Sequence, residues 1–188
     1  MSEAVSSMAG AEFSGAVDIR EDGLQGMVTL RGDLGDAKIA GAVKAAVGLA
    51  MPKARQIKQG KNGGVAWMSP DEVLLLCDHA GADALVAKLD RALEGVHHLA
   101  VNVSDARAMF TLTGTGVREV IAKGAPADLS PAGLPIGEIR RSRIGQIAAA
   151  FWLSEAETMH VVCFRSVGAH MFRWLENAAA ADTLPGVL

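Results

Sequence analysis

Five histidines and two cysteines are the residues of this chain best suited to a zinc site. Zinc sites use Cys and His ligands at short, regular spacings. No two histidines and no two cysteines are three or four residues apart, so we expect no metal site. Cys77 and Cys163 both lie in apolar, strand-like runs, which favours buried reduced thiols.

The nucleophile and phosphate-binding motifs are also missing or incomplete. No serine stands in the Gly-x-Ser-x-Gly context of a nucleophile elbow. The turn at Gly114-Thr115-Gly116 lacks the third glycine of the dinucleotide-binding fingerprint. Ser104, Asp105 and Arg107 form a polar cluster where a strand should emerge, and we favour a structural Arg–carboxylate pair there over catalysis. The residues therefore predict no catalytic site.

The hydrophobic pattern places these groups on alternating strands and helices. Met27–Arg31 has the period of two of a half-buried strand, and the residues after Asp36 repeat every four, as on an amphipathic helix. Two strands flank the turn at Ser69-Pro70-Asp71 and predict a hairpin, which a second helix follows. The pattern predicts an α+β fold built on a strand, helix, hairpin, helix unit.

The same order of elements recurs in the second half of the chain. Val28–Gly32 matches Phe110–Gly114 at an offset of 82 residues, Trp67 matches Trp152 at 85, and Cys77 matches Cys163 at 86. Because Trp and Cys are rare in this chain, their joint registration predicts an internal duplication. The alternative is that any two units of this kind look alike when only apolar positions are compared.

This register puts His160 at the position of Leu74, in a central strand. We expect it to be a hydrogen-bonded core or interface histidine rather than a catalytic base.

The predicted organisation is a single globular domain with a tail at each end. Residues 1–23 are small, polar and acidic and predict a flexible tail. Residues 24–180 form the domain, from two related halves of about 24–96 and 97–180, and residues 181–188 form a C-terminal tail.

Charge and hydropathy exclude several partners. A net charge of -3 argues against nucleic-acid binding, which needs an excess of Lys and Arg. Between Asp36 and Asp71 all charged residues are basic, which is typical of a solvated face; a docking surface for an acidic partner is the alternative. No apolar run reaches the ~18 residues of a membrane span, and no secretory signal is recognisable. We expect a cytoplasmic protein that binds neither nucleic acid nor membrane.

Several short segments stand out between about Val28 and Ala178 for their order and spacing. They are Val65–Leu75, Val103–Arg107, Leu112–Gly114, Lys123-Gly124, Asp128–Pro131 and Phe164–Ser166. Together they resemble the gamma subunit family of heterotetrameric sarcosine oxidase. That family is similar in fold to the folate-binding domains of the glycine-cleavage T-protein, which themselves contain related halves.

The resemblance implies a noncatalytic assembly subunit, with alpha, beta and delta subunits as partners. The complex would oxidatively demethylate sarcosine to glycine and pass the one-carbon unit to tetrahydrofolate. No cofactor is then expected on this chain: flavins, NAD and folate would belong to the alpha and beta subunits, and zinc to the delta subunit. Under this hypothesis the candidate interface residues are Trp67, Arg107, Lys123, Trp152 and Arg165.

The alternative function is a stand-alone folate-binding or one-carbon-transfer protein with the same fold. It would need a carboxylate to hold the pterin ring, and Asp105 is the one candidate.

Overall fold

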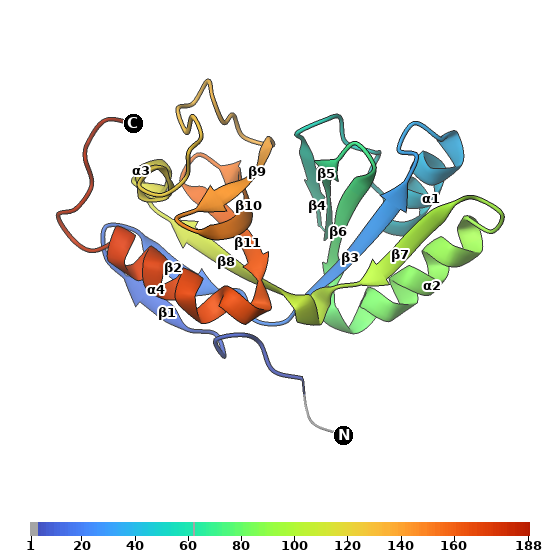
Figure 1. The fold of residues 1–188 in the computed structure, drawn as a ribbon, viewed down its shortest axis with the longest axis horizontal. Coiled ribbons are helices and arrows are strands. Elements are labelled where there is room, and N and C mark those ends of the chain that lie inside the picture. The colour runs from blue at the N-terminus through green and yellow to red at the C-terminus, as the bar shows by residue number, and fades with distance from the viewer. Residues whose placement is uncertain (1–3, 62) are drawn as a thin grey trace. The chain divides into compact units, whose positions relative to one another are not determined.

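The computed structural model describes residues 4–61 and 63–188, which form two compact units (Figure 1). Gln25–Asp105 make up one of them, here called the contiguous unit. The other, the split unit, combines the described residues up to Leu24 with Ala106–Leu188.

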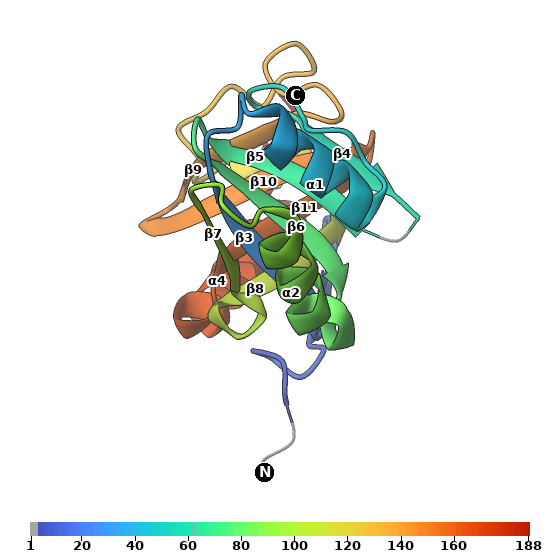
Figure 2. The ribbon, with the colours of Figure 1, turned by 90° about the vertical axis from the view of Figure 1, so that its right-hand side faces the viewer.

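The contiguous unit is a five-stranded antiparallel sheet with two helices on one face (Figure 2). The strands lie in the order β4-β5-β6-β3-β7. Asp36 begins α1 by accepting a hydrogen bond from the Lys38 N–H at 2.7 Å, and Gly48 ends it in the left-handed region at φ 75°. The elements are β3 (Gln25–Gly32), α1 (Ala37–Val47), β4 (Ile57–Gly60), β5 (Gly63–Ser69), β6 (Glu72–Asp78), the 3-10 turn η1 (His79–Gly81), α2 (Ala82–Ala92) and β7 (His98–Asn102).

The split unit is a six-stranded antiparallel sheet in the order β1-β2-β8-β11-β10-β9. Its core combines residues of β2, β8, β10 and β11 with the apolar faces of α3 and α4. Its elements are β1 (Glu12–Ser14), β2 (Asp18–Glu21), β8 (Arg107–Thr113), α3 (Val117–Ala122), β9 (Ile139–Ile144), β10 (Ile147–Glu155), β11 (Thr158–Phe164), the 3-10 turn η3 (Arg165–Val167) and α4 (Gly168–Ala178). A further 3-10 turn, η2 (Ser104–Ala106), precedes β8.

The strand registers confirm the internal duplication. Val28 pairs with Leu75 in the contiguous unit, and Phe110 pairs with Val161 in the split unit, as offsets of 82 and 86 require. Both hairpins also carry a register shift at the same place, between Trp67 and Ser69 and between Leu153 and Glu155.

The match of Trp67 to Trp152, however, is one residue out of register. Trp67 pairs with Val73, and the equivalent pair in the split unit is Leu153 with Met159. Successive residues of a strand face opposite sides of the sheet. Leu153 therefore joins the core that the helices cover, and Trp152 belongs to the other face.

The predicted N-terminal tail is contradicted where residues 12–14 and 18–21 form β1 and β2. Val17 and Ile19 are buried in the core of the split unit. Residues 1–3 of the predicted tail lie outside the described part of the chain. Residues 18–21 form a strand because β2 pairs with the side of β8 that β11 leaves open.

The structure also moves the boundary between the halves. β7 pairs with β3, so the first unit runs to Asp105 rather than to about residue 96.

At the C-terminal end of the chain, residues 181–188 have no regular secondary structure, but the Glu119 carboxylate accepts hydrogen bonds from Gly186, Val187 and Leu188. These bonds fix the predicted C-terminal tail to α3.

Leu89 and Leu99 provide a matched test of the core assignment. Leu89 of α2 is fully buried, so Leu89→Ala should lower the free energy of unfolding by about 2–5 kcal/mol. Leu99 of β7 is 54 % exposed, so Leu99→Ala should change it by less than about 0.5 kcal/mol. Urea unfolding followed by circular dichroism measures both. Equal losses would show that the two burial assignments are wrong.

Candidate functional site

A chain of hydrogen bonds crosses the split unit and contains the half-buried imidazole of His160. Thr111 of β8 lies opposite His160 of β11, and its Oγ1 is 3.0 Å from Nδ1 of that histidine. The Nε2 atom of His160 is 2.9 Å from Oγ of Ser154 on β10. The prediction that His160 lies in a central strand with hydrogen-bond partners is confirmed.

The direction of these bonds fixes the tautomer of the imidazole. Thr111 donates its single hydroxyl hydrogen to Asp22 Oδ2 at 2.7 Å, so it can only accept from His160 Nδ1. Nε2 then accepts the hydrogen of the Ser154 hydroxyl. Burial lowers the pKa of His160, which the carboxylate of Asp22 opposes and Arg20 supports. The ring is therefore neutral near pH 7.

A serine hydroxyl bonded to a neutral imidazole is the arrangement that activates nucleophiles. Here the indole of Trp152 packs against the same imidazole, with ring centroids 5.2 Å apart, and Trp152 is fully buried. The network pairs the partly buried polar groups of β8, β10 and β11 with one another, in agreement with the structural interpretation of His160.

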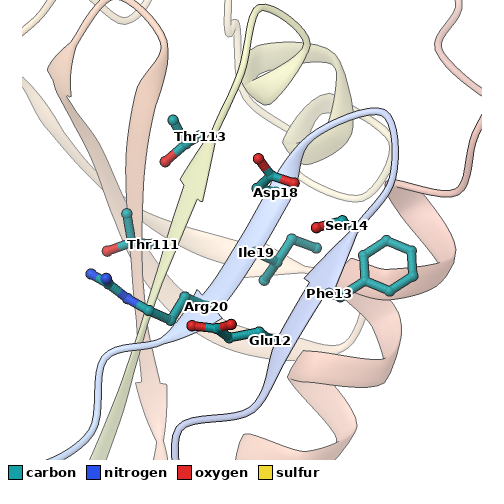
Figure 3. A pocket seen from close by; sticks show the side chains of 8 residues that line it. All are labelled: Glu12, Phe13, Ser14, Asp18, Ile19, Arg20, Thr111 and Thr113. Carbon is teal, nitrogen blue, oxygen red and sulfur yellow. The ribbon is translucent and has the colours of Figure 1, made fainter.

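A surface hollow of about 420 Å³ lies beside this network on β1, β2 and β8 (Figure 3). Glu12, Asp18 and Arg20 supply its charged groups, and Thr111 and Thr113 supply hydroxyls. Sequence reasoning missed this hollow because it took β1 and β2 for a flexible tail. The alternation of Val17 and Ile19 with polar neighbours was the available signal.

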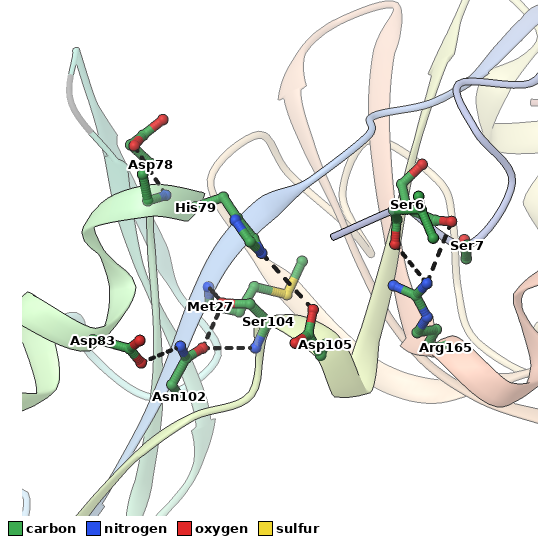
Figure 4. A network of polar contacts seen from close by, with 12 residues as sticks. Ser6, Ser7, Met27, Asp78, His79, Asp83, Asn102, Ser104, Asp105 and Arg165 are labelled. Atoms are coloured by element: carbon green, nitrogen blue, oxygen red, sulfur yellow. Dashed lines mark hydrogen bonds and ion pairs between the residues drawn. The ribbon is translucent and has the colours of Figure 1, made fainter. Parts of the chain in front are cut away.

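The end of the contiguous unit holds a second polar network, around Ser104 (Figure 4). The Ser104 hydroxyl accepts from the Met27 N–H at 2.9 Å and donates to Asn102 Oδ1 at 2.6 Å. The Asn102 amide in turn donates to Asp83 of α2 at 2.6 Å. These bonds hold the end of β7 against β3 and α2.

Asp105, the candidate for binding a pterin ring, lies next to this network. Its side chain is 82 % exposed, and its Oδ1 is 3.8 Å from Nε2 of His79 (Figure 4). The Arg107 guanidinium lies over the Phe164 ring, 4.5 Å from its centroid. The predicted Arg107–carboxylate pair stays a prediction.

The remaining interface candidates differ in how they are held. Trp67 of β5 is half-buried, whereas Trp152 is fully buried and its indole nitrogen has no hydrogen-bond partner among the described residues. Lys123 donates to the Ala178 carbonyl and to Thr183, and it thereby ties the C-terminal segment to α4. Arg165 donates to the carbonyls of residues 5 and 6 (Figure 4).

Neither a metal-binding cluster nor a membrane-spanning helix occurs in the described part of the chain. Residues 4–61 and 63–188 contain no group of three or more His, Cys, Asp or Glu side chains placed to hold a metal ion. Within the same ranges, no helix has the length and apolar character that crossing a bilayer requires.

The fold places the chain among two-unit α+β proteins of the T-protein type. The glycine cleavage system aminomethyltransferase T from Bartonella henselae superimposes with a TM-score of 0.63 at 14% identity, over 86% of this chain and 46% of that one. This likeness concerns the fold alone. The model of the sarcosine oxidase, gamma subunit family matches residues 31–181, and the chain belongs to this family. The predicted resemblance is confirmed.

Two known proteins are similar to this chain over nearly its whole length. The sarcosine oxidase subunit gamma of Arthrobacter sp is 28% identical over 182 residues, which cover 96% of this chain and 88% of the relative. A chain of the heterotetrameric sarcosine oxidase from Corynebacterium sp. U-96, solved in complex with pyrrole 2-carboxylate, has a TM-score of 0.80 at 26% identity. That match covers 89% of this chain and 87% of the other.

The partly buried His160 predicts a pH dependence of stability. Its pKa is lowered on folding, so the unfolded chain takes up a proton first as the pH falls below the ordinary histidine value of about 6.5. The stability that the neutral imidazole contributes is thus present well above that value and is lost as the pH falls through it. His160→Leu, which copies Leu74 of the other unit, should reduce this decline in urea unfolding at each pH.

The control is His170→Leu on the exposed surface of α4, which should keep the decline of the original chain. An undiminished decline in His160→Leu would contradict the assignment.

Proposed function

We propose that this chain is the noncatalytic gamma subunit of a heterotetrameric sarcosine oxidase and that its role is assembly. The observation that carries the proposal is the match, at a TM-score of 0.80 over 89% of the chain, to a chain of such a heterotetramer. Its partners would be the alpha, beta and delta subunits. The complex would demethylate sarcosine to glycine and pass the one-carbon unit to tetrahydrofolate.

The internal contacts of the reactive side chains support an assembly role. His160 bonds to Thr111 through Nδ1 and to Ser154 through Nε2. Burial raises the pKa of the Cys163 thiol to about 12, which keeps it a thiol at neutral pH, although Arg107 opposes the shift. We propose that flavins, NAD, folate and zinc belong to the partner subunits and that the complex is cytoplasmic. Both cysteines are free thiols, as is usual in that compartment.

Four of the five candidate interface residues keep exposed surface and stay our candidates. They are Trp67, Arg107, Lys123 and Arg165. Trp152 is fully buried within this chain, so a direct contact with a partner would require a rearrangement of β10.

Co-purification tests the assembly proposal. The chain, expressed together with tagged large subunits from the same organism, should elute with them, and native mass spectrometry should show one copy per complex. Persistence of the chain as a separate species in the presence of all three partners would overturn the proposal.

The stand-alone folate-binding alternative rests on the exposed carboxylate of Asp105 beside His79. Titration of the isolated chain with tetrahydrofolate separates the two functions. Under the assembly proposal, calorimetry should detect no binding at millimolar ligand, for the original chain and for Asp105→Asn alike. Binding by the original chain that Asp105→Asn abolishes would favour the alternative.

A further inference from the structure

Three of the four outer edges of the two sheets are protected against pairing with another strand. β4 carries Lys58, and β9 carries Arg140, Arg141 and Arg143. β1 is three residues long and begins with Glu12. Charged side chains and short strands are the usual means by which proteins block edge pairing.

The fourth edge, β7, has neither kind of protection. Its sequence, His98-Leu99-Ala100-Val101-Asn102, holds no Lys, Arg, Asp or Glu. Leu99 and Val101 are 54 % and 39 % exposed. In the part of the chain that the structure describes, no strand pairs with the outer side of β7, which forms one end of the sheet (Figure 2).

The split unit shows how the equivalent edge is covered. Leu30 pairs with Ala100 in one unit and Leu112 pairs with Ile19 in the other, so β2 is the counterpart of β7. On its outer side β2 carries β1, antiparallel, with Phe13 opposite Ile19 (Figure 3). An apolar side chain opposite Ala100 would complete the contiguous unit in the same way.

The backbone of β7 presents its free groups in the direction that this pairing needs. The Val103 N–H donates to the Met27 carbonyl at 2.8 Å, so alternation turns the amides of Ala100 and Asn102 away from β3. On β2, Glu21 N–H likewise donates outward to the Ala11 carbonyl, and the Val17 carbonyl accepts from Gly15 N–H. β7 and β2 therefore present equivalent backbone N–H and C=O groups on their outer sides.

A carboxylate marks each end of the open edge. Asp83 of α2 accepts from Asn102 at 2.6 Å, and Asp90 lies 3.1 Å from Nε2 of His98, with 55 % of its side chain exposed. A second copy of β7 would bring no Lys or Arg to these positions and, in antiparallel pairing, would bring further carboxylates toward them. Like charges across a strand pair are destabilising.

We propose that β7 pairs, antiparallel, with an extended segment of a partner subunit that has apolar residues opposite Leu99, Ala100 and Val101 and a basic residue at each end. The pairing deepens the proposed assembly function and depends on it. The main-chain hydrogen bonds would provide affinity, and Asp83 and Asp90 would select the partner by charge.

Hydrogen–deuterium exchange on the co-purified complex and on the isolated chain tests the pairing without any variant. The amides of Ala100 and Asn102 should exchange at least roughly 10-fold more slowly in the complex. Equal rates in the two samples would overturn the proposal. Protection that grows with the concentration of the isolated chain would also overturn it, because a second copy would then be the occupant.

Ala100→Pro removes the outward N–H and leaves the bonds to β3 in place, a substitution that edge strands tolerate. Its incorporation into the complex should fall roughly 10-fold below that of the original chain. Ala100→Ser, which keeps the N–H, is the matched control and should assemble normally. Circular dichroism of both isolated variants checks their folding.

Assembly of Ala100→Pro at the original level would overturn the strand pairing but leave the assembly function intact. Failure of the original chain to associate would overturn the assembly proposal, and the strand pairing with it.

Discussion

The two equivalent central strands, β3 and β8, each have one side that the hairpin of their unit leaves open, and the rest of the fold depends on covering that side. β3 and β8 are each paired on one side with the second hairpin strand, β6 or β11. Backbone N–H and C=O groups on the other side need partners where they are buried. The contiguous unit supplies β7 from the residues after α2, whereas the split unit takes β2 from the N-terminal part of the chain. The split unit is therefore complete only when residues about 90 positions apart have met, which is a slow kind of contact in folding.

Each covering strand ends at a polar group that fixes it in place. β2 ends at Glu21, whose carboxylate accepts hydrogen bonds from Ser6, Ser7, Gly10 and Gly23. Burial alone would raise the pKa of this carboxyl, but these hydrogen bonds bring it below its ordinary value. β7 ends next to Ser104, which bonds to Met27 and Asn102. The two positions therefore use different groups, a carboxylate at Glu21 and a hydroxyl at Ser104.

The duplication could be predicted from the sequence because equivalent positions kept rare residues. Cys77 and Cys163 occupy matching places in β6 and β11, and the offset found from them put His160 in its strand correctly. β1 and β2 gave a weak signal, since they are three and four residues long and only their pairing with β8 stabilises them. The His160 network joins three strands and a loop, and its members Asp22 and Thr111 are 89 residues apart. Such a site has no local sequence motif, and its geometry follows only from the order of the strands.

The two units differ in how their outer strand edges are protected against pairing. A protein with two open strand edges can add copies of itself without limit, because heterologous contacts that do not close produce filaments. Here β1 closes the edge of the split unit, and basic residues occupy β4 and β9. A single uncharged edge remains, at β7, with Asp83 and Asp90 at its ends. Under the proposed pairing, this edge accepts a defined partner, and the protection of the other edges restricts self-assembly.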